Sequence, residues 1–501
     1  MRGIDDELRD FIRYDNLGAR DALRHLLAKM PKSARVRAML AESHLRSFEP
    51  EAARDLYRTA LDLAPVEVSL HHQLGLCAIL CGDPAEALRI FREAAAFAPA
   101  ELSRYMVALL LHRLGRLDEA TSAFRELTAR LDVAHGETPY VLRSAAMASR
   151  DAGALVESDC YARELHRLRE LNPAQICSTL IERDNTIDFH EWTRLSRKDE
   201  FAALVARRYG KNAGALNFPA TYSLPDARAA LLDHARREPD AFWVAKPKHG
   251  TGGQGVVVTR NVAEFADLAD VVVQRYLDRP HLVDGCKSVL RLYVFTTSVS
   301  PLRAYLYGDG IVRFAPDRFE SGLGNARAHV TNTARHRDYE GLILSADASQ
   351  ESFGHVWSVN AYRRRLDADG LDASQVWIGV RALIKEMLAM LEADGLFARQ
   401  SASAPRRSYA PKLFGVDVLI DEKGKAWLIE LEKKPALGGL PLVDRIHNEM
   451  FNTMFEMTCP IIAAEAEASQ EIARLIDDPA ALDEHEARLA NQARGKFERL
   501  V

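Results

Sequence analysis

The sequence has few cysteines, no long apolar run and no strong excess of charge of either sign. Six cysteines in 501 residues do not make a disulfide framework. A net charge of −5 gives no general reason to expect a nucleic-acid or membrane partner. No apolar run is long enough to span a bilayer, and the charged first residues lack the apolar segment of a secretory signal. These absences predict a cytoplasmic protein in a reducing compartment.

Cys77 and Cys81 are one helical turn apart, a spacing that two metal ligands could share. No second pair of Cys or His follows at the spacing of a zinc site, so buried free thiols are the expected state.

The first third of the chain repeats itself at an interval of 34 residues. Residues 50–65 (PEAARDLYRTALDLAP) resemble residues 84–99 (PAEALRIFREAAAFAP), and the matching positions are Ala53/Ala87, Tyr57/Phe91, Ala60/Ala94 and Pro65/Pro99. This is the tetratricopeptide period, and Gly75 falls where the first helix of that repeat needs a small residue. A third copy places Ala108, Gly115, Ala120 and Phe124, and a fourth runs from Tyr140 to Pro173 with Gly153 at its turn.

Repeats of this length cannot bury their apolar faces alone, so they stack into a solenoid. We therefore predict a helical tetratricopeptide-like domain over residues 1–173. Its concave surface is expected to dock a protein or peptide, and a spacer or dimerisation arm is the alternative.

Beyond residue 173 the pattern changes to short runs rich in Val, Ile, Tyr and Phe, with helical segments between them. We expect strands at 242–247, 255–259, 271–277, 289–299, 302–314, 413–421 and 425–432. This alternation predicts a catalytic region of mixed α and β structure rather than more solenoid.

Neither the P-loop nor the dinucleotide-binding fingerprint occurs in this region. Instead, a strand ends at Lys246 and runs into the glycine-rich segment KPKHGTGGQGV, residues 246–256. Glycines such as Gly253 allow close backbone approach and offer N–H groups to phosphate oxygens, and an ammonium at Lys246 could reach the same oxygens. By itself, a glycine-rich turn is a weak signal.

Three carboxylates are expected to converge at the end of a predicted hairpin. Asp417 lies inside an apolar strand, and Glu430 and Glu432 lie two residues apart on the next strand, facing the same side. Carboxylates this close need a cation between them, and Mg²⁺ prefers such oxygen ligands together with phosphates. Lys287 and Arg291, on another strand, would need an anion if they face inward. The sequence thus predicts a magnesium–nucleotide site.

Five segments occur in the order seen in the tubulin tyrosine ligase-like family of ATP-grasp ligases. They are NFPATYSLP, WVAKPKHGTGGQGVVV, the block from VVVQRYLD to VRFA, HVTNTA and LFGVDVLIDEKGKAWLIELEKKPAL. The resemblance covers about residues 175–460. It implies an α+β ATP-grasp domain, which we place at 174–465, followed by a C-terminal helical tail at 466–501.

The resemblance also implies a role for individual residues. Lys246 resembles the lysine that contacts the phosphates of ATP. The other implied positions are the hinge beside the adenine (Gln274, Tyr276), the phosphate-binding cations (Lys287, Arg291), the neighbours of ribose and phosphate (Thr331, Asn332), two magnesium ligands (Asp417, Glu430) and a basic residue facing the amino acid or acceptor (Arg313). Arg303, in the same block, is a further candidate for substrate binding.

Three positions depart from the family pattern. The third magnesium ligand is usually Asn and is Glu432 here, a second basic residue of the glycine-rich loop is replaced by Gly252, and Val289 stands where the family has Asp. These changes leave open a shifted substrate or an inert protein. Residues 399–412, rich in Ser, Ala and Pro, are expected to form a mobile loop that could close over the site.

Members of this family activate a peptide carboxylate as an acyl phosphate, which an amino acid then attacks. The resemblance therefore implies an ATP- and Mg²⁺-dependent ligase that joins an amino acid to a protein or peptide carboxylate, with the acceptor recruited by the repeats. Two alternatives stay open. One is a ligase acting on a small molecule or ribosomal peptide, and the other is an inert nucleotide-binding adaptor that works through the repeat domain.

Overall fold

The computed structural model describes residues 16–46, 49–97, 100–130, 138–171, 195, 197–210, 216–248, 255–265, 268, 270–319, 325–336, 338–397, 412–432, 435, 439–458, 475 and 478–501. The chain divides into two compact units. Unit 1 comprises Met1–Thr193, Arg399–Ala410 and Phe455–Ala493, and unit 2 comprises Arg194–Ala398, Pro411–Met454 and Arg494–Val501.

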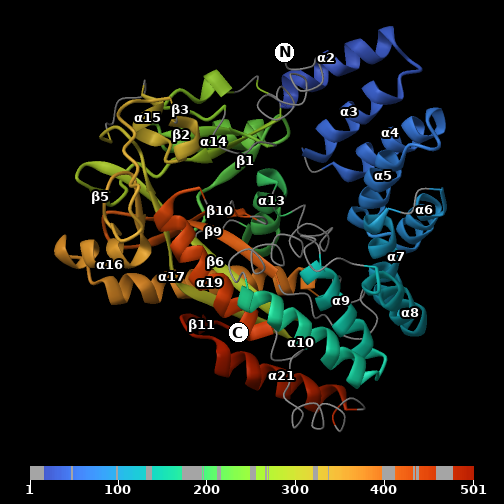
Figure 1. Ribbon diagram of the computed structural model, residues 1–501. Helices are drawn as coiled ribbons and strands as arrows, with labels where there is room; N and C mark the ends of the chain where they lie inside the picture. Colours follow the sequence, from blue (N-terminus) through green and yellow to red (C-terminus); the bar gives the residue numbers. More distant parts are fainter. Residues whose placement is uncertain are drawn as a thin grey trace. The chain divides into compact units, whose positions relative to one another are not determined.

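The described part of unit 1 is helical, as the repeat predicted (Figure 1). Its helices are α2 (Asn16–Lys29), α3 (Ala34–Arg46), α4 (Pro50–Leu63), α5 (Val68–Leu80), α6 (Pro84–Phe97), α7 (Glu101–Arg113), α8 (Leu117–Thr128), α9 (Thr138–Asp151), α10 (Leu155–Leu171) and α21 (Pro479–Ala493). Successive helices from α2 to α10 pack against each other, which is how a solenoid buries its apolar faces.

The repeated small and aromatic residues are the ones that these helices bury. The repeated alanines of α4 and α6 are fully buried, as are Tyr57 and Phe91. Gly75 shows why this period needs a small residue, because a Cβ there would lie 2.5 Å from the ring of Phe91. The thiols of Cys77 and Cys81 are free, and burial raises the pKa of Cys77 to about 12.

Arginines of the second helices recur at nearly the same period, 34 and then 33 residues apart. An arginine on one of these helices pairs with a glutamate on the next, and the pairs are Arg58–Glu86 (2.6 Å), Arg92–Glu119 (3.3 Å) and Arg125–Glu157 (2.8 Å). We call this set the arginine–glutamate ladder.

Unit 2 contains two antiparallel sheets. The smaller has the order β1-β4-β2-β3 and is built from β1 (Thr221–Ser223), β2 (Trp243–Pro247), β3 (Val257–Thr259) and β4 (Val271–Arg275). One of its faces packs a core that includes Trp243, Ala245 and Val273 together with Leu231 of α14 (Arg228–Arg237). Helix α13 (Lys198–Tyr209) and the 3₁₀ turn η2 (Val262–Phe265) complete this part.

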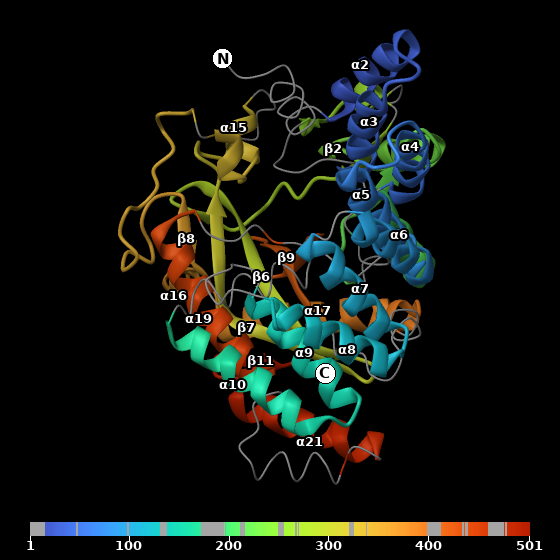
Figure 2. The ribbon, with the colours of Figure 1, turned by 45° about the vertical axis from the view of Figure 1, so that its right-hand side comes forward.

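The larger sheet has the order β10-β9-β6-β7-β11, with β5 beside β6 and β8 beside β7. Its strands are β5 (Leu282–Val283), β6 (Cys286–Val299), β7 (Leu302–Phe314), β8 (Val356–Ser358), β9 (Lys412–Ile420), β10 (Ala426–Glu432) and β11 (Phe497–Arg499). The long strands β6 and β7 run side by side in Figure 2. The remaining elements are α15 (Ala326–His329), η3 (Thr333–His336), α16 (Val359–Ala368), α17 (Ala373–Ala393) and α19 (Pro441–Thr458), of which residues up to Met454 belong to this unit.

The sequence did not predict the end of the chain correctly. We expected a helical tail, and α21 is such a helix, but residues 497–499 form a strand that pairs with β7 in unit 2. The predicted domain boundary at residue 173 lies outside the described residues. Of the loop predicted at 399–412, residues 399–411 also lie outside them, and Lys412 begins β9. In the described parts of the chain, no helix is both long enough and apolar enough to cross a membrane.

Candidate functional site

The smaller sheet supplies one wall of a pocket, because alternate residues of a strand point to opposite faces. On β2, Trp243 and Ala245 face the core beside α14, so Val244 and Lys246 face the other way and line the pocket. The same alternation on β4 places Gln274 on the pocket face.

The larger sheet supplies the opposite wall with a row of charged residues. Lys287, Val289 and Arg291 lie at every second position of β6 and line the pocket. Arg291 is the cross-strand partner of Asp417 on β9, and Asp417 is in turn the partner of Glu430 on β10. The hairpin therefore brings the two acids side by side, as the sequence predicted.

The pocket between these walls has about 1160 Å³ of free space, part of which is open to solvent. Valines, leucines and an isoleucine line it together with charged side chains, and these apolar members are Val244, Val256, Val258, Leu277, Val289, Val330, Leu419 and Ile429. An apolar slot beside convergent polar groups is the usual composition of a small-molecule site.

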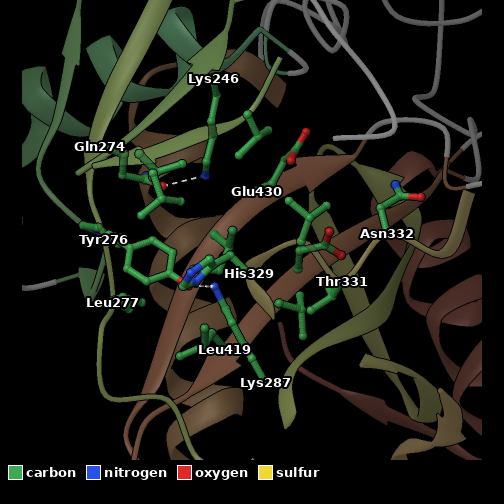
Figure 3. Close-up of a pocket in the computed structure, with 18 of the residues that line it drawn as sticks. Lys246, Gln274, Tyr276, Leu277, Lys287, His329, Thr331, Asn332, Leu419 and Glu430 are labelled. Atoms are coloured by element: carbon green, nitrogen blue, oxygen red, sulfur yellow. Dashed lines mark hydrogen bonds between the residues drawn. The ribbon is translucent and has the colours of Figure 1, made fainter. Parts of the chain in front are cut away.

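Two lysines of the pocket, Lys287 buried and Lys246 partly buried, have uncharged partners (Figure 3). Lys246 Nζ donates to the Gln274 side-chain oxygen at 2.7 Å, and Lys287 Nζ donates to the Tyr276 hydroxyl at 2.9 Å. Burial lowers the pKa of Lys246 to about 8. Burial, and then the charge of Lys246, lowers the pKa of Lys287 to about 7. Among the described residues, neither ammonium group donates a hydrogen bond to a carboxylate, although the charges of Glu430 and Asp417 act on Lys246. This arrangement favours an anionic ligand.

The acids, in contrast, have cationic neighbours. Arg291 forms a two-pronged ion pair with Asp417, with one nitrogen–oxygen distance of 3.0 Å, and Arg313 lies 3.8 Å from the same carboxylate. Burial alone would raise the pKa of Asp417, but the charge and hydrogen bonds of Arg291 outweigh it and the pKa is lowered. Lys198 lies 3.5 Å from Glu430.

Glu432 marks a corner of the pocket that is crowded with negative charge. Burial is the main cause that raises its pKa to about 7, and Glu430 and Asp417 add to the effect although Arg291 opposes it. Carboxylate oxygens are the donors that Mg²⁺ prefers, so the types of side chain fit this metal. Among the described residues, however, no group of three or more His, Cys, Asp or Glu side chains is arranged so that it could hold a metal ion.

The pocket brings together nearly all the residues that the sequence singled out. Its described lining includes Lys246, Gln274, Tyr276, Lys287, Arg291, Arg313, Thr331, Asn332, Asp417, Glu430 and Glu432. Gly253 and Gly252 lie outside the described residues. Arg303 is not one of the described residues that line the pocket, because it pairs with Ser298 near the opposite end of β7 from Arg313.

Three polar residues of the pocket, Lys198, Arg275 and His329, were missed from the sequence. Lys198 begins α13, far from the predicted motifs, and no local signal marked it. His329 was left out of the predicted set, yet it lines the pocket, with its Nδ1 2.9 Å from the Tyr276 hydroxyl. The segment HVTN, residues 329–332, indicated Thr331 and Asn332, but nothing in the sequence indicated which side chain His329 contacts.

Comparison with known families matches the two predicted regions separately. Residues 178–467 match the model of the tubulin-tyrosine ligase family, which is more than half of the chain. Residues 68–93 and 102–126 match the tetratricopeptide repeat.

Known relatives with similar sequences include tubulin glutamylases. The chain is 30% identical over 283 residues to human tubulin polyglutamylase TTLL5, which covers 55% of this chain and 22% of the relative. It is 28% identical over 272 residues to human tubulin monoglutamylase TTLL4, which covers 53% of this chain and 22% of that relative. It is 29% identical over 227 residues to mouse tubulin polyglutamylase TTLL6, which covers 44% of this chain and 27% of that relative. The similarity thus spans only about a quarter of each relative's length or less.

Proposed function

This chain belongs to the tubulin-tyrosine ligase family, and on that premise we propose that it is an ATP- and Mg²⁺-dependent ligase. It would join the amine of an amino acid to a carboxylate of a protein or peptide. The terminal phosphoryl group of ATP would pass to the carboxylate, releasing ADP. The amine would then displace phosphate from the acyl phosphate and form the amide.

One observation carries the proposal. Lys287 is buried in the pocket and Lys246 is partly buried there, and both donate hydrogen bonds to uncharged groups, while Asp417 and Glu430 have cationic neighbours. The positive charge of the two lysines is therefore available to a polyanion such as a triphosphate. The apolar slot beside Gln274 and Tyr276 suits a nucleobase.

The chain's own residues would perform the chemistry by holding charge and aligning reactants, because phosphoryl transfer needs no side-chain nucleophile. Lys246 and Lys287 would bind phosphate oxygens, and Thr331 and Asn332 would contact ribose and phosphate. Arg291 would stabilise the transferred charge, and Arg313 would face the amino acid or the acceptor. Mg²⁺ would be held by one or two carboxylates from the set Asp417, Glu430 and Glu432 together with the phosphates, whose charge it would neutralise when bound.

The names of the relatives suggest which reactants to test first. Their glutamylase activity makes glutamate the first amino acid to test and tubulin the first acceptor. The repeat domain would recruit the acceptor, since solenoid surfaces commonly bind proteins.

One feature of the pocket favours a second candidate function, an inert nucleotide-binding adaptor. Val289 lines the pocket with an apolar side chain where a carboxylate is usual in ligases of this kind. An adaptor of this kind would bind ATP but release no ADP.

The experiment measures thermal stabilisation by ATP, with and without Mg²⁺, and then ADP release with candidate amino acids and acceptors. A ligand that binds the folded state raises the melting temperature by mass action. We expect stabilisation of the wild type by Mg²⁺-ATP and its loss in Glu430→Gln. The matched control is Glu422→Gln, an exposed acid in the turn of the same hairpin, which should respond like the wild type.

If millimolar Mg²⁺-ATP stabilises none of the three proteins, the ligase proposal is wrong. If it stabilises the wild type but no combination of amino acid and acceptor releases ADP, the adaptor becomes the better proposal.

A further inference from the structure

The hydroxyl of Tyr276 lies between a lysine and a histidine of the pocket wall (Figure 3). Its oxygen is 2.9 Å from Lys287 Nζ and 2.9 Å from His329 Nδ1. The three side chains come from separate elements, since Tyr276 follows β4, Lys287 lies on β6 and His329 ends α15. All three are buried, with 6–8% of their surfaces exposed. They form one connected chain of hydrogen bonds in the wall.

The chemistry of the three groups fixes the direction of these hydrogen bonds when the lysine is charged. An ammonium group can only donate, so Lys287 donates to the Tyr276 oxygen. The phenol has one proton, and Nδ1 of His329 is positioned to accept it. We therefore assign His329 as the neutral tautomer with its proton on Nε2. In this arrangement, the histidine orients the tyrosine hydroxyl and the hydroxyl orients the ammonium.

Aromatic contacts hold these three hydrogen-bonded side chains in place. The ring of His329 meets the rings of Tyr276 and Phe319 edge-on, with centroids 5.5 and 5.4 Å apart. Lys287 Nζ also lies 4.3 Å from the centre of the Tyr276 ring, within the range of a cation–π contact. Among the described side chains, only Tyr276 accepts a hydrogen bond from Lys287, so two of its three N–H donors are available to a ligand.

Two other buried tyrosine–histidine pairs and a partly buried one show that the lysine is the distinctive member. Hydroxyl–imidazole distances of 2.6–2.9 Å join Tyr222 to His234, Tyr293 to His447 and Tyr362 to His281. In the described part of the chain, none of these three hydroxyls accepts a hydrogen bond from a lysine. Of these four pairs, only the pair at Tyr276 is hydrogen bonded to a lysine of the pocket within the described residues.

We infer that His329, acting through Tyr276, is a positioning residue that holds the ammonium of Lys287 on the pocket wall for the phosphate groups of a nucleotide. This inference rests on the proposed function, because it requires an anionic ligand. A free lysine side chain loses rotamer entropy when it binds a ligand, and a lysine that is already held loses less. The hydrogen-bonded chain therefore strengthens phosphate binding without itself touching the phosphates.

The test compares the affinities of Mg²⁺-ATP and adenosine by calorimetry. Tyr276→Phe keeps the ring and removes the hydroxyl, and His329→Leu removes the acceptor. We expect each to weaken Mg²⁺-ATP by about tenfold, the usual effect of one hydrogen bond to a charged group. Adenosine, which has no phosphate, should change by less than about twofold in either variant. The double variant should bind Mg²⁺-ATP about as tightly as either single variant, because both changes break the same chain.

Two further variants sharpen the result. His329→Asn retains an acceptor close to the position of Nδ1 and should restore most of the affinity for Mg²⁺-ATP. Tyr222→Phe removes a hydroxyl from a comparable pair outside the pocket and should leave both affinities unchanged.

If Mg²⁺-ATP and adenosine lose affinity equally, the hydrogen bonds at Tyr276 have a purely structural role and the inference is overturned. Unchanged affinities, or additive effects in the double variant, would overturn it as well. If His329→Leu does not fold, Tyr276→Phe decides by the same criteria. Failure of the wild type to bind Mg²⁺-ATP would instead overturn the proposed function, and the inference with it.

Discussion

Binding of a nucleotide triphosphate should take up protons, because the two pocket lysines are partly neutral in the free protein. Their pKa values are about 8 for Lys246 and about 7 for Lys287, against an ordinary value of 10.5. Phosphate oxygens beside them would favour the charged forms and raise both pKa values. The complex then holds more protons than the free protein. By linkage, the affinity for nucleotide falls as the pH rises.

The magnitude follows from the two pKa values if both lysines are fully charged in the complex. Binding should take up about 0.6 protons at pH 7, about 1.4 at pH 8 and about 1.9 at pH 9. The affinity should fall about tenfold from pH 7 to 8 and about fiftyfold from pH 8 to 9. These totals belong to the pair, because the charge of Lys246 lowers the pKa of Lys287.

The assay is calorimetric titration of Mg²⁺-ATP at one pH in buffers with different ionisation enthalpies, since the slope of the observed enthalpy gives the proton uptake. Excess Mg²⁺ keeps the triphosphate itself deprotonated. Lys287→Met should reduce the uptake at pH 7 to about 0.1 protons. Lys423→Met, in the exposed hairpin turn, should behave like the wild type. Zero uptake at pH 8, or an affinity that rises with pH, would refute the assignment of these lysines to the phosphates.

Three further predictions concern stability. Lys287→Met should raise the melting temperature of the free protein more at pH 6 than at pH 9, because the lowered pKa of Lys287 makes its burial most unfavourable below about pH 7; an equal effect at both pH values would contradict this. Calorimetry should show that Gly75→Ala lowers the free energy of unfolding by about 1–2 kcal/mol, because overlap of the new Cβ with Phe91 exceeds the gain in helix propensity. As a control, Gly379→Ala should raise it by up to about 1 kcal/mol, because Gly379 is an exposed position of helix α17 with nothing within 4 Å of a new Cβ. Glu119→Gln should lower the melting temperature slightly in dilute salt and not at all in 1 M salt, because exposed ion pairs contribute little to stability and are screened.

The solenoid was predictable from the sequence because its determinants are local. Each repeat places its small and aromatic residues at the same offsets, so the 34-residue period was enough to predict the stacked helices, and the structure confirms them. The arginines of the arginine–glutamate ladder have nearly the same period and could have been found in the same way, whereas its glutamates do not keep that period. The strand at 497–499 could not, because three residues carry no periodicity and its pairing with β7 is set by tertiary packing.

The candidate site was predictable where one strand or one hairpin determined it. The hairpin of β9 and β10 was enough to place Asp417 beside Glu430, although a bulge between Leu428 and Glu430 sets the final register. Contacts between separate elements were not predictable. Arg303 and Arg313 lie on the same strand, and only the pairing of that strand shows that Arg313 alone lines the pocket. The hydrogen bonds that join three elements at Tyr276 likewise have no trace in the sequence.

The partners of the charged residues distinguish structural charges from those available for function. In the arginine–glutamate ladder every arginine has a carboxylate partner and lies at the exposed surface, so its charge is neutralised within the solenoid. In the pocket, the partly buried Lys246 donates to an amide and the buried Lys287 donates to a phenol, an arrangement that lowers both pKa values and destabilises the free protein. A fold selected only for stability would replace or neutralise such groups. Because an anion would relieve the same penalty, nucleotide binding and folding stability should be coupled through these two lysines.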